Sequence, residues 1–397
     1  MKKDMFQIGP QTLQMLELGH PWVIADRYTK TWPSGRPGDL VELRDAGGQM
    51  VATALLDPKD RIVARVLERG PMNFGGAWLA EKIQRALNLR TRTLDLDRTS
   101  AYRLVNAEGD GLPGLTVDRY ENHLMVQFFC RSWQPHLTMI ADTLDKLLKP
   151  RGIYVKHRPQ QTRELADEGK RCSRLLTGRG APGRLQVMEN GLNFLVELET
   201  GLNTGLFCDQ RNNRRDLMGR IRGGSVLNLF SYTGAFSVAA AAGAARVTSV
   251  DASAGYLDWA RENFAANRLN PKRHEFILGD CFTVLEELVR KKDRFDLVIM
   301  DPPSFSTVGK SRFTTTGGTA ELVTLALDLL PAGGLLVTSS NHQKVDWADY
   351  LKELRRGALR AGCDLRILAT SGQGEDFPYS VTFPEGRYLK FVIGMKG

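Results

Sequence analysis

The fold is decided by an apolar strand, a turn with one glycine and a helix, which follow one another in Val226-Leu227-Asn228-Leu229-Phe230-Ser231-Tyr232-Thr233-Gly234-Ala235-Phe236. The apolar run before the turn is short and bounded by polar residues, as in a buried strand. A helical pattern begins at Ala235. This order predicts one unit of an α/β sheet, with the turn at the carboxyl end of its strand.

The same alternation continues along the chain. The predicted strands are 226–230, 247–251, 275–280, 295–301 and 334–339, and the predicted helices between them are 235–242, 254–267, 282–291 and 318–329. Apolar strands separated by helices indicate a parallel sheet that is covered on both faces. A helix over 347–361 and strands over 364–370 and 388–395 follow. No helical pattern separates the last two strands, which predicts an antiparallel pair. A seven-stranded, Rossmann-like sheet closed in this way is typical of class I methyltransferases.

Two other regions precede this sheet. Residues 1–72 hold short alternating strands punctuated by glycine and proline, which predict a small β-barrel. Residues 73–190 mix helices at 77–89 and 135–148 with strands at 115–119, 124–130 and 153–156, which predict an α/β middle domain. A hairpin of 185–188 with 193–197 leads into the third domain, residues 191–397.

Composition and charge exclude several classes of protein. The chain has 397 residues, 25% of them charged, and no run of eighteen apolar residues that would predict a membrane-spanning helix. Five scattered cysteines lack metal-ligand spacing, so we expect no metal site and a reducing, cytoplasmic location.

The positive charge is concentrated in one segment. Of a net charge of +9, the segment 149–184 supplies ten basic against three acidic residues. Such an excess predicts a polyanionic partner, although a solvated loop is at least as good an explanation of the charge alone. The candidate contacts to nucleic acid are Lys156, Arg158 and Arg163.

Polar residues follow the strands at the edge where open α/β sheets bind ligands. Asp251 ends the second strand and is a candidate acceptor for two ribose hydroxyls. Asp280 and Cys281 end the third and are placed to bind an adenine amino group, with a helix cap as an almost equal alternative for Asp280. The turn lacks the G-x-G-x-x-G pattern of a pyrophosphate site. We therefore expect S-adenosylmethionine, which has no phosphate, and the predicted contacts from the turn are Asn228, Ser231, Tyr232 and Gly234, whose missing side chain would let the ligand approach the backbone.

The fourth strand ends in Asp301-Pro302-Pro303-Ser304-Phe305. Two prolines hold the backbone extended at the point where a transferred methyl group would face its acceptor. We therefore predict Asp301, Pro302, Pro303 and Phe305 as catalytic-site residues, with Asp301 also close to the cofactor.

These motifs resemble those of the ribosomal RNA large-subunit methyltransferase I family, bacterial PUA-containing enzymes that methylate 23S rRNA at cytosine C5. The matching segments are spread along nearly the whole chain: 19–23, 102–114, 204–211, 231–234, 301–303 and 384–390. The resemblance implies that the barrel is an RNA-binding PUA domain and that Gln210 and Arg211 line the cofactor pocket. It also implies 23S rRNA, free or in a precursor particle, as the partner. A homodimer is one assembly that the sequence leaves open.

The chain departs from this family after the fifth strand. The segment Thr338-Ser339-Ser340-Asn341-His342 carries Ser340 where the cytosine enzymes have a cysteine. Cytosine C5 needs covalent activation by a thiolate, whereas guanine N7 carries a lone pair and needs mainly correct placement. Residues 301–306 and 339–341 are similar to those of the domain that makes 7-methylguanosine in 23S rRNA.

We therefore predict methylation of guanine N7, with Asn341 bonding the base edge and Phe305 or Tyr379 stacking on the base. Cytosine C5 with a displaced nucleophile, adenine N6, a small-molecule substrate and a non-catalytic RNA-binding protein are the alternatives.

Overall fold

The computed structural model describes residues 5–157, 173–201, 203–243, 246–303, 305–308, 311–314 and 318–397. These residues fall into two compact units, each assembled from separate parts of the chain. Unit 1 comprises residues 1–185, 197–204 and 375–386, and unit 2 comprises 186–196, 205–374 and 387–397. The predicted domain boundaries at residues 72 and 190 stay predictions.

The first part of unit 1 is a five-stranded sheet with one helix. Its elements are β1 (Phe6–Gln7), α1 (Pro10–Glu17), β2 (Trp22–Ile24), β3 (Leu40–Arg44), β4 (Met50–Leu56) and β5 (Ile62–Arg69). The strand order is β1-β3-β4-β5-β2. Strand β3 buries Val41 and Leu43 and exposes Leu40 and Glu42, which is the alternation expected of a strand with one face in a core.

The second part of unit 1 packs two helices against a five-stranded sheet. Its elements are α2 (Gly76–Thr93), β6 (Ala101–Asn106), β7 (Leu115–Tyr120), β8 (His123–Phe128), α3 (Leu137–Leu148), β9 (Gly152–His157) and β10 (Ser173–Gly178). The order is β10-β9-β8-β7-β6, with β8 and β9 parallel. Leu79 and Ile83 of α2 and Ile140 and Leu144 of α3 are buried in the shared core. The sequence predicted both helices but neither β6 nor β10.

Unit 2 contains the seven-stranded sheet. Its strands are β13 (Ser225–Leu229), β14 (Arg246–Asp251), β15 (Glu275–Leu278), β16 (Leu297–Met300), β19 (Leu335–Ser340), β20 (Leu365–Ser371) and β21 (Lys390–Lys396). The order is β15-β14-β13-β16-β19-β21-β20. The first five strands are parallel, and β21 lies antiparallel between β19 and β20. This confirms the predicted sheet and its antiparallel end.

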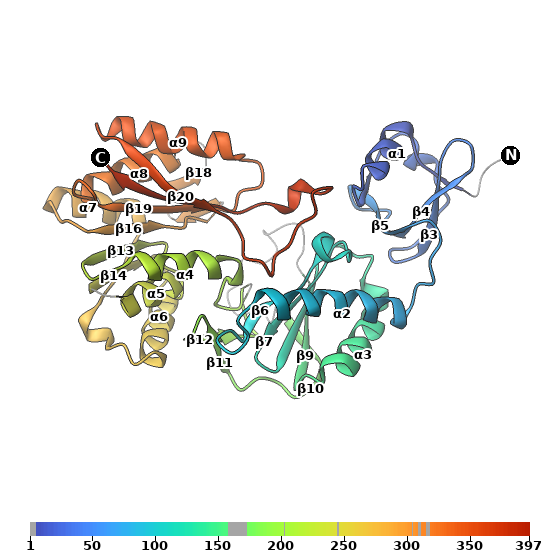
Figure 1. Ribbon diagram of the computed structural model, residues 1–397, viewed down its shortest axis with the longest axis horizontal. Helices are drawn as coiled ribbons and strands as arrows, with labels where there is room; N and C mark the ends of the chain where they lie inside the picture. Colours follow the sequence, from blue (N-terminus) through green and yellow to red (C-terminus); the bar gives the residue numbers. More distant parts are fainter. Residues whose placement is uncertain are drawn as a thin grey trace. The chain divides into compact units, whose positions relative to one another are not determined.

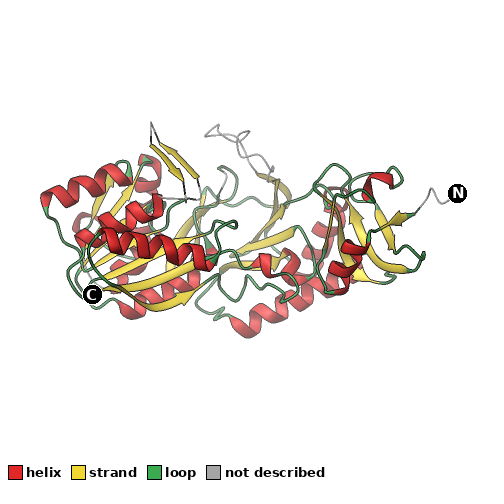
Figure 2. Ribbon diagram, turned by 90° about the horizontal axis from the view of Figure 1, so that it is seen from above, coloured by secondary structure: helices red, strands yellow, loops and turns green. Residues whose placement is uncertain are grey.

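In the described residues, six helices cover the two faces of this sheet, as can be followed in Figures 1 and 2. They are α4 (Arg211–Arg220), α5 (Ala235–Gly243), α6 (Ala254–Ala266), α7 (Cys281–Lys291), α8 (Gly318–Leu329) and α9 (Trp347–Arg360). Figure 1 shows α4, α5 and α6 on one side of the sheet and α7, α8 and α9 on the other. The second group shares a large apolar core with the strands, through residues such as Leu285, Leu327 and Leu354.

Unit 2 also has elements that the sequence did not predict. They are helix α4 and a hairpin directly after the Asp301–Pro303 segment, in which β17 (Phe305–Val308) pairs with β18 (Ser311–Thr314). The predicted hairpin before the sheet is present as β11 (Arg184–Glu189) and β12 (Leu192–Glu197). In the described residues, none of the helices combines the length and apolar character that a membrane crossing requires.

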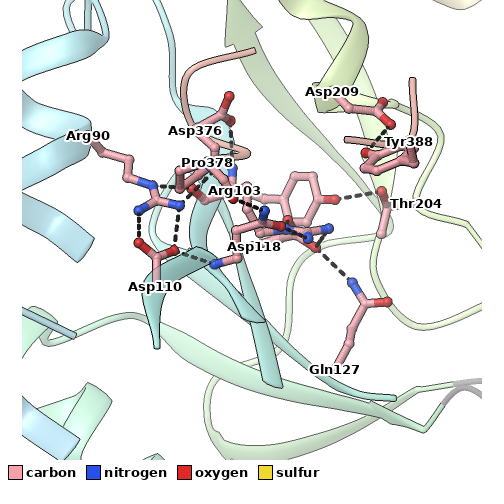
Figure 3. A network of polar contacts seen from close by, with 12 residues as sticks. Arg90, Arg103, Asp110, Asp118, Gln127, Thr204, Asp209, Asp376, Pro378 and Tyr388 are labelled. Carbon is pink, nitrogen blue, oxygen red and sulfur yellow. Dashed lines mark hydrogen bonds and ion pairs between the residues drawn. The ribbon is translucent and has the colours of Figure 1, made fainter. Parts of the chain in front are cut away.

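Residues 375–386, here called the strap, connect β20 to β21 but belong to unit 1. A buried polar network fixes the strap there (Figure 3). Arg90 is fully buried, donates to both carboxylate oxygens of Asp110 at 2.7 and 2.8 Å, and donates to the Asp376 carbonyl at 2.7 Å. Asn106 donates to the Pro378 carbonyl at 2.8 Å. The strap is therefore bonded through its main chain to the elements around the middle sheet.

Candidate functional site

The turn after β13 has an unusual backbone. Phe230, Tyr232 and Gly234 have φ values of 55°, 51° and 76°. Bulky residues with positive φ are uncommon and cost about 1–3 kcal/mol each, and they concentrate at functional sites. Asp251 at the end of β14 holds this turn, because its carboxylate accepts the Tyr232 N–H at 2.8 Å and the Ser253 N–H at 2.9 Å. The turn and the carboxylate thus form one rigid edge.

Gly234 has a packing reason that the sequence did not reveal. A Cβ atom at this position would lie 2.8 Å from the Ala260 Cβ in α6. We had expected the glycine to let a ligand approach the backbone. The structure shows that α6 approaches the glycine, and the positive φ adds another reason for glycine at this position.

Two other residues of the turn differ in their surroundings. The Ser231 hydroxyl is buried and has no hydrogen-bond partner in the part of the chain that the structure describes. Asn228 is 2% exposed and donates to the Ser237 hydroxyl of α5 at 2.8 Å. The Asn228 side chain therefore serves the packing of β13 against α5, and its predicted role as a cofactor contact stays without a supporting contact.

At the third strand end, Asp280 is the cap of α7. One of its carboxylate oxygens accepts the N–H groups of Phe282 and Thr283, both at 3.1 Å. The neighbouring Cys281 is 3% exposed, and its sulfur accepts the Phe230 N–H at 3.2 Å. Burial raises the pKa of the Cys281 thiol to about 12. This thiol therefore stays protonated and is a poor nucleophile.

The fourth strand end carries a compact hydrogen-bonded cluster around Asp301. One carboxylate oxygen accepts the Ser339 hydroxyl, and the other accepts the Gln210 amide N–H at 3.3 Å. The same amide nitrogen donates to the Ser339 hydroxyl oxygen at 3.2 Å. Burial raises the pKa of Asp301 to about 6, against the hydrogen bonds from Ser339 and Gln210 that lower it. The cluster is a partly buried carboxylate, and both of its oxygens accept hydrogen bonds.

The structure thus brings Gln210 to Asp301, whereas the sequence had placed it only at the cofactor. Its neighbour Arg211 opens α4 and is 2% exposed. Sequence reasoning missed Ser339 and the helix residue Asn213, which donates to Gln210 at 2.6 Å. One signal was available: Thr338-Ser339-Ser340 puts three hydroxyls at the end of a buried strand, where apolar residues are the rule.

Ser340 does not share the direction of Ser339. Successive side chains of a strand point to opposite faces, and Thr338, on the same face as Ser340, bonds Tyr350 of α9 at 2.7 Å. Ser340 is 8% exposed, and its hydroxyl accepts the His342 N–H at 3.4 Å. The position of the missing cysteine therefore faces away from the Asp301 cluster. Asn341, just beyond the strand, is exposed.

The structure describes only some of the remaining predicted residues. Pro302 and Pro303 follow Asp301 directly, and Pro303 is exposed. The side chain of Phe305, together with Arg158 and Arg163, lies outside the described residues.

Lys156 requires a correction. It is 1% exposed, and its ammonium group donates to the Gly201 carbonyl at 3.1 Å within unit 1. A buried, bonded ammonium group is not available to RNA, so the prediction for Lys156 was wrong; the charge count of the segment could not reveal its burial.

Comparison with known proteins identifies both parts of the chain. A model of a PUA-like domain matches residues 6–69, and a model of an S-adenosylmethionine-dependent methyltransferase matches residues 103–377. The chain belongs to the S-adenosylmethionine-dependent methyltransferases.

This methyltransferase is 32% identical over 374 residues to proteins of Yersinia pseudotuberculosis and Yersinia pestis named Ribosomal RNA large subunit methyltransferase I, and the match covers 94% of each chain. The predicted relationship is therefore confirmed. A methyltransferase crystallised with S-adenosylhomocysteine has a TM-score of 0.88 and 27% identity, covering 99% of this chain and all of the other. A methyltransferase of Streptococcus mutans, with the same coverage, gives 0.86 and 26%.

The residues of this methyltransferase fit its cofactor, S-adenosylmethionine. Among the described residues, the Ser231 hydroxyl has no protein partner, whereas buried polar groups are normally bonded. Burial raises the pKa of Asp251 at the next strand end. An unpaired donor and a partly buried acceptor at adjacent strand ends suit a ligand rich in hydroxyl and amino groups. Among the described residues, no group of His, Cys, Asp and Glu side chains is arranged to hold a metal ion.

Proposed function

We propose that this methyltransferase modifies guanine N7 in large-subunit ribosomal RNA. The names of its relatives and the PUA-like match support ribosomal RNA as the substrate. The observation that favours N7 is Ser340. Activation of cytosine C5 would need a thiol at this position, whereas guanine N7 needs none. Ser340 offers no thiol and faces away from the Asp301 cluster. Of the cysteines nearest in sequence to the site, Cys281 has a pKa raised to about 12, and Cys208 is 5% exposed.

For the cofactor, we propose that Asp251 accepts the ribose hydroxyls and that Asp280 and Cys281 border the adenine. The turn residues Ser231 and Tyr232 would lie against the rest of the molecule, with Gly234 shaping the turn. Gln210 and Arg211 would complete the pocket from the start of α4. The bound cofactor supplies an activated methyl group.

The Asp301 carboxylate suits the edge of guanine. An ionised carboxylate has about four acceptor positions, and the two hydrogen bonds from Ser339 and Gln210 leave others available. Guanine presents two donors, N1–H and the N2 amino group, on one edge, whereas cytosine presents one. We propose that Asp301 accepts from this edge and that Pro302 and Pro303 hold the loop rigid. Asn341 and Phe305 would bond and stack the base.

Mass spectrometry of 23S rRNA nucleosides from cells with and without the gene tests the substrate. We expect 7-methylguanosine to fall in the deletion strain, to return with the wild-type gene and to stay low with Asp301→Asn. Loss of 5-methylcytidine with 7-methylguanosine unchanged would overturn the proposal for N7. If calorimetry detected no binding of S-adenosylmethionine, the non-catalytic alternative would stand instead.

The similarity over 94% of the chain supports cytosine C5 with a displaced nucleophile as the second candidate. Cys208 is then the nucleophile to test, because it directly precedes Asp209 and Gln210. An RNA substrate containing 5-fluorocytidine would form a stable covalent adduct with the wild type and none with Cys208→Ser. Absence of an adduct with the wild type would remove this candidate.

A further inference from the structure

We propose that Asn213 is a positioning residue of the methyl transfer, which fixes the Gln210 amide so that its N–H group faces the Asp301 carboxylate. The proposal rests on the catalytic role given to Asp301 above. The family match and the sequence motifs assign no role to Asn213.

The contacts form a single directed series. The Ser371 hydroxyl donates to the Asn213 side-chain oxygen at 2.7 Å, and the Asn213 amide N–H donates to the Gln210 oxygen at 2.6 Å. Gln210 then donates to Asp301 at 3.3 Å and to Ser339 at 3.2 Å. Each donor in the series points toward Asp301, so the series supports negative charge on that carboxylate.

Asn213 is itself held in one orientation. Its amide nitrogen donates to the Gly372 carbonyl at 3.2 Å as well as to Gln210. Reversing the Asn213 amide would place its oxygen against these two acceptors. Reversing the Gln210 amide would place its oxygen against the Asp301 carboxylate and its NH₂ group against that of Asn213. Both reversals are unfavourable, so one arrangement is selected.

Burial strengthens the preference for this one arrangement of the Asn213 and Gln210 amides. Asn213 is 1% exposed, Gln210 3% and Ser339 2%, so water is not at hand to replace a lost partner. Other titratable groups among the described residues lie near Asp301. Asp209 raises its pKa, Arg214 lowers it, and Tyr350 stays neutral because burial raises the phenol pKa. None of these groups is altered by a change at position 213, so such a change isolates the effect of the Gln210 amide.

The test is Asn213→Leu, which keeps the branching of the side chain at a somewhat larger volume and removes both hydrogen-bonding groups. The Gln210 amide is then no longer fixed in one orientation, so its N–H group no longer donates to Asp301 at all times. The readout is the titration of the Asp301 carboxyl by ¹³C NMR in protein labelled at the aspartate carboxyl carbon, with Asp301→Asn to identify the signal. We expect the midpoint to rise by about one pH unit relative to the wild type. We also expect the acid limb of the kcat profile to move by the same amount.

The matched control is Asn267→Leu, the same replacement at the end of α6, where Asn267 donates to the carbonyls of Asn193 and Asn263. Asn267→Leu should lower stability without moving the Asp301 midpoint. If Asn213→Leu does not fold, Asn213→Ala serves as the second variant, because it removes the donor to Gln210 without adding a charge near Asp301.

An Asp301 midpoint unchanged in the folded variant at position 213 overturns the proposal. An equal shift in Asn267→Leu also overturns it, because the effect would then come from general loosening. The NMR titration needs no RNA, so it gives its answer even if the wild type proves not to methylate guanine, and the two failures are distinguishable.

Discussion

At the scale of single residues, the site places a carboxylate where its charge is costly. Asp301 lies at the end of a buried strand, and its pKa is raised to about 6. Ser339 and Gln210 offset part of that cost by donating hydrogen bonds. Such an arrangement trades stability for function, because the ionised form is the one that can accept a hydrogen bond from a substrate.

Asp301→Asn should therefore make the protein more stable and inactive. The folded-state pKa lies above the ordinary value of 3.8, so folding favours the protonated form and stability falls as the pH rises from about 4 to 6. The asparagine variant avoids this loss and should gain about 1–3 kcal/mol at pH 7.5, with no gain at pH 3.5. Urea unfolding at the two pH values measures the difference, and methyl transfer should fall at least about 100-fold.

Asp280→Ala is a useful control for this measurement. Asp280 caps α7, so its removal should cost about 1 kcal/mol, an effect of opposite sign. If Asp301→Asn were less stable than the wild type at pH 7.5, the carboxylate would be a stabilising group and the proposed trade would be wrong.

At the scale of elements, α4 supplies Asn213 to the site and its N-cap residue is Gln210. An ion pair holds this helix in place. Arg214 and Glu189 form two hydrogen bonds of 2.6 and 2.7 Å, and both side chains are at most 3% exposed. Arg214 also donates to the Phe207 carbonyl at 2.7 Å. The helix is thus attached to β11 and to the segment before it by charge rather than by an apolar stripe.

Glu189→Gln should destabilise the fold by about 3–5 kcal/mol, because the buried Arg214 guanidinium would lose the carboxylate to which it is bonded. Thermal or urea unfolding measures this loss. Asp216→Asn is the matched control on the same helix, since Asp216 pairs with Arg220 at the surface and should contribute at most about 1 kcal/mol. Equal losses in the two variants would show that Glu189 does not secure α4.

Helix α4 also shows which elements can be predicted from the sequence and which cannot. Strands and helices around the sheet were predictable because each carries an apolar run or an apolar period, as β13 and α7 do. The segment Arg211–Arg220 has almost no apolar residues, so nothing in its pattern indicates burial. It is buried through polar partners, and those partners are distant in sequence.

The positions of the site residues along the chain were predictable, but their contacts were not. The strand-end position of Asp301 followed from the order of the elements, whereas its contact with Gln210 joins residues 91 positions apart. Lys156 was misjudged because charge can be counted from sequence but burial cannot. The face to which Ser340 points depends on the register of β19, which composition does not define.

At the scale of the whole molecule, positive charge is unevenly distributed. Residues 6–69, the PUA-like match, contain eight basic and eight acidic residues and carry no net charge. The excess lies elsewhere, and the segment 149–184 holds much of it. We expect the PUA-like domain to contribute shape recognition of RNA and the basic segment to contribute most of the salt-dependent affinity.

Arg158→Glu with Arg163→Glu should therefore weaken binding to a 23S rRNA fragment and reduce the slope of log K against log salt by at least about 1.4, from two lost phosphate contacts. Filter binding between 50 and 200 mM KCl measures the slope. Lys156→Met is the control, because the buried Lys156 should leave the slope unchanged while lowering stability. An unchanged slope in the double variant would assign the RNA contacts to another surface.

The strap has a consequence for how the protein is made. Unit 1 is completed only by residues 375–386, and the sheet of unit 2 only by β21, which inserts between two strands that precede it in the chain. Nearly the whole mRNA must therefore be translated before either unit contains all the residues of its core. Premature termination before codon 375 would release a chain with two unfinished cores rather than one working half, and the gene could not be divided at a single point into separately folding products.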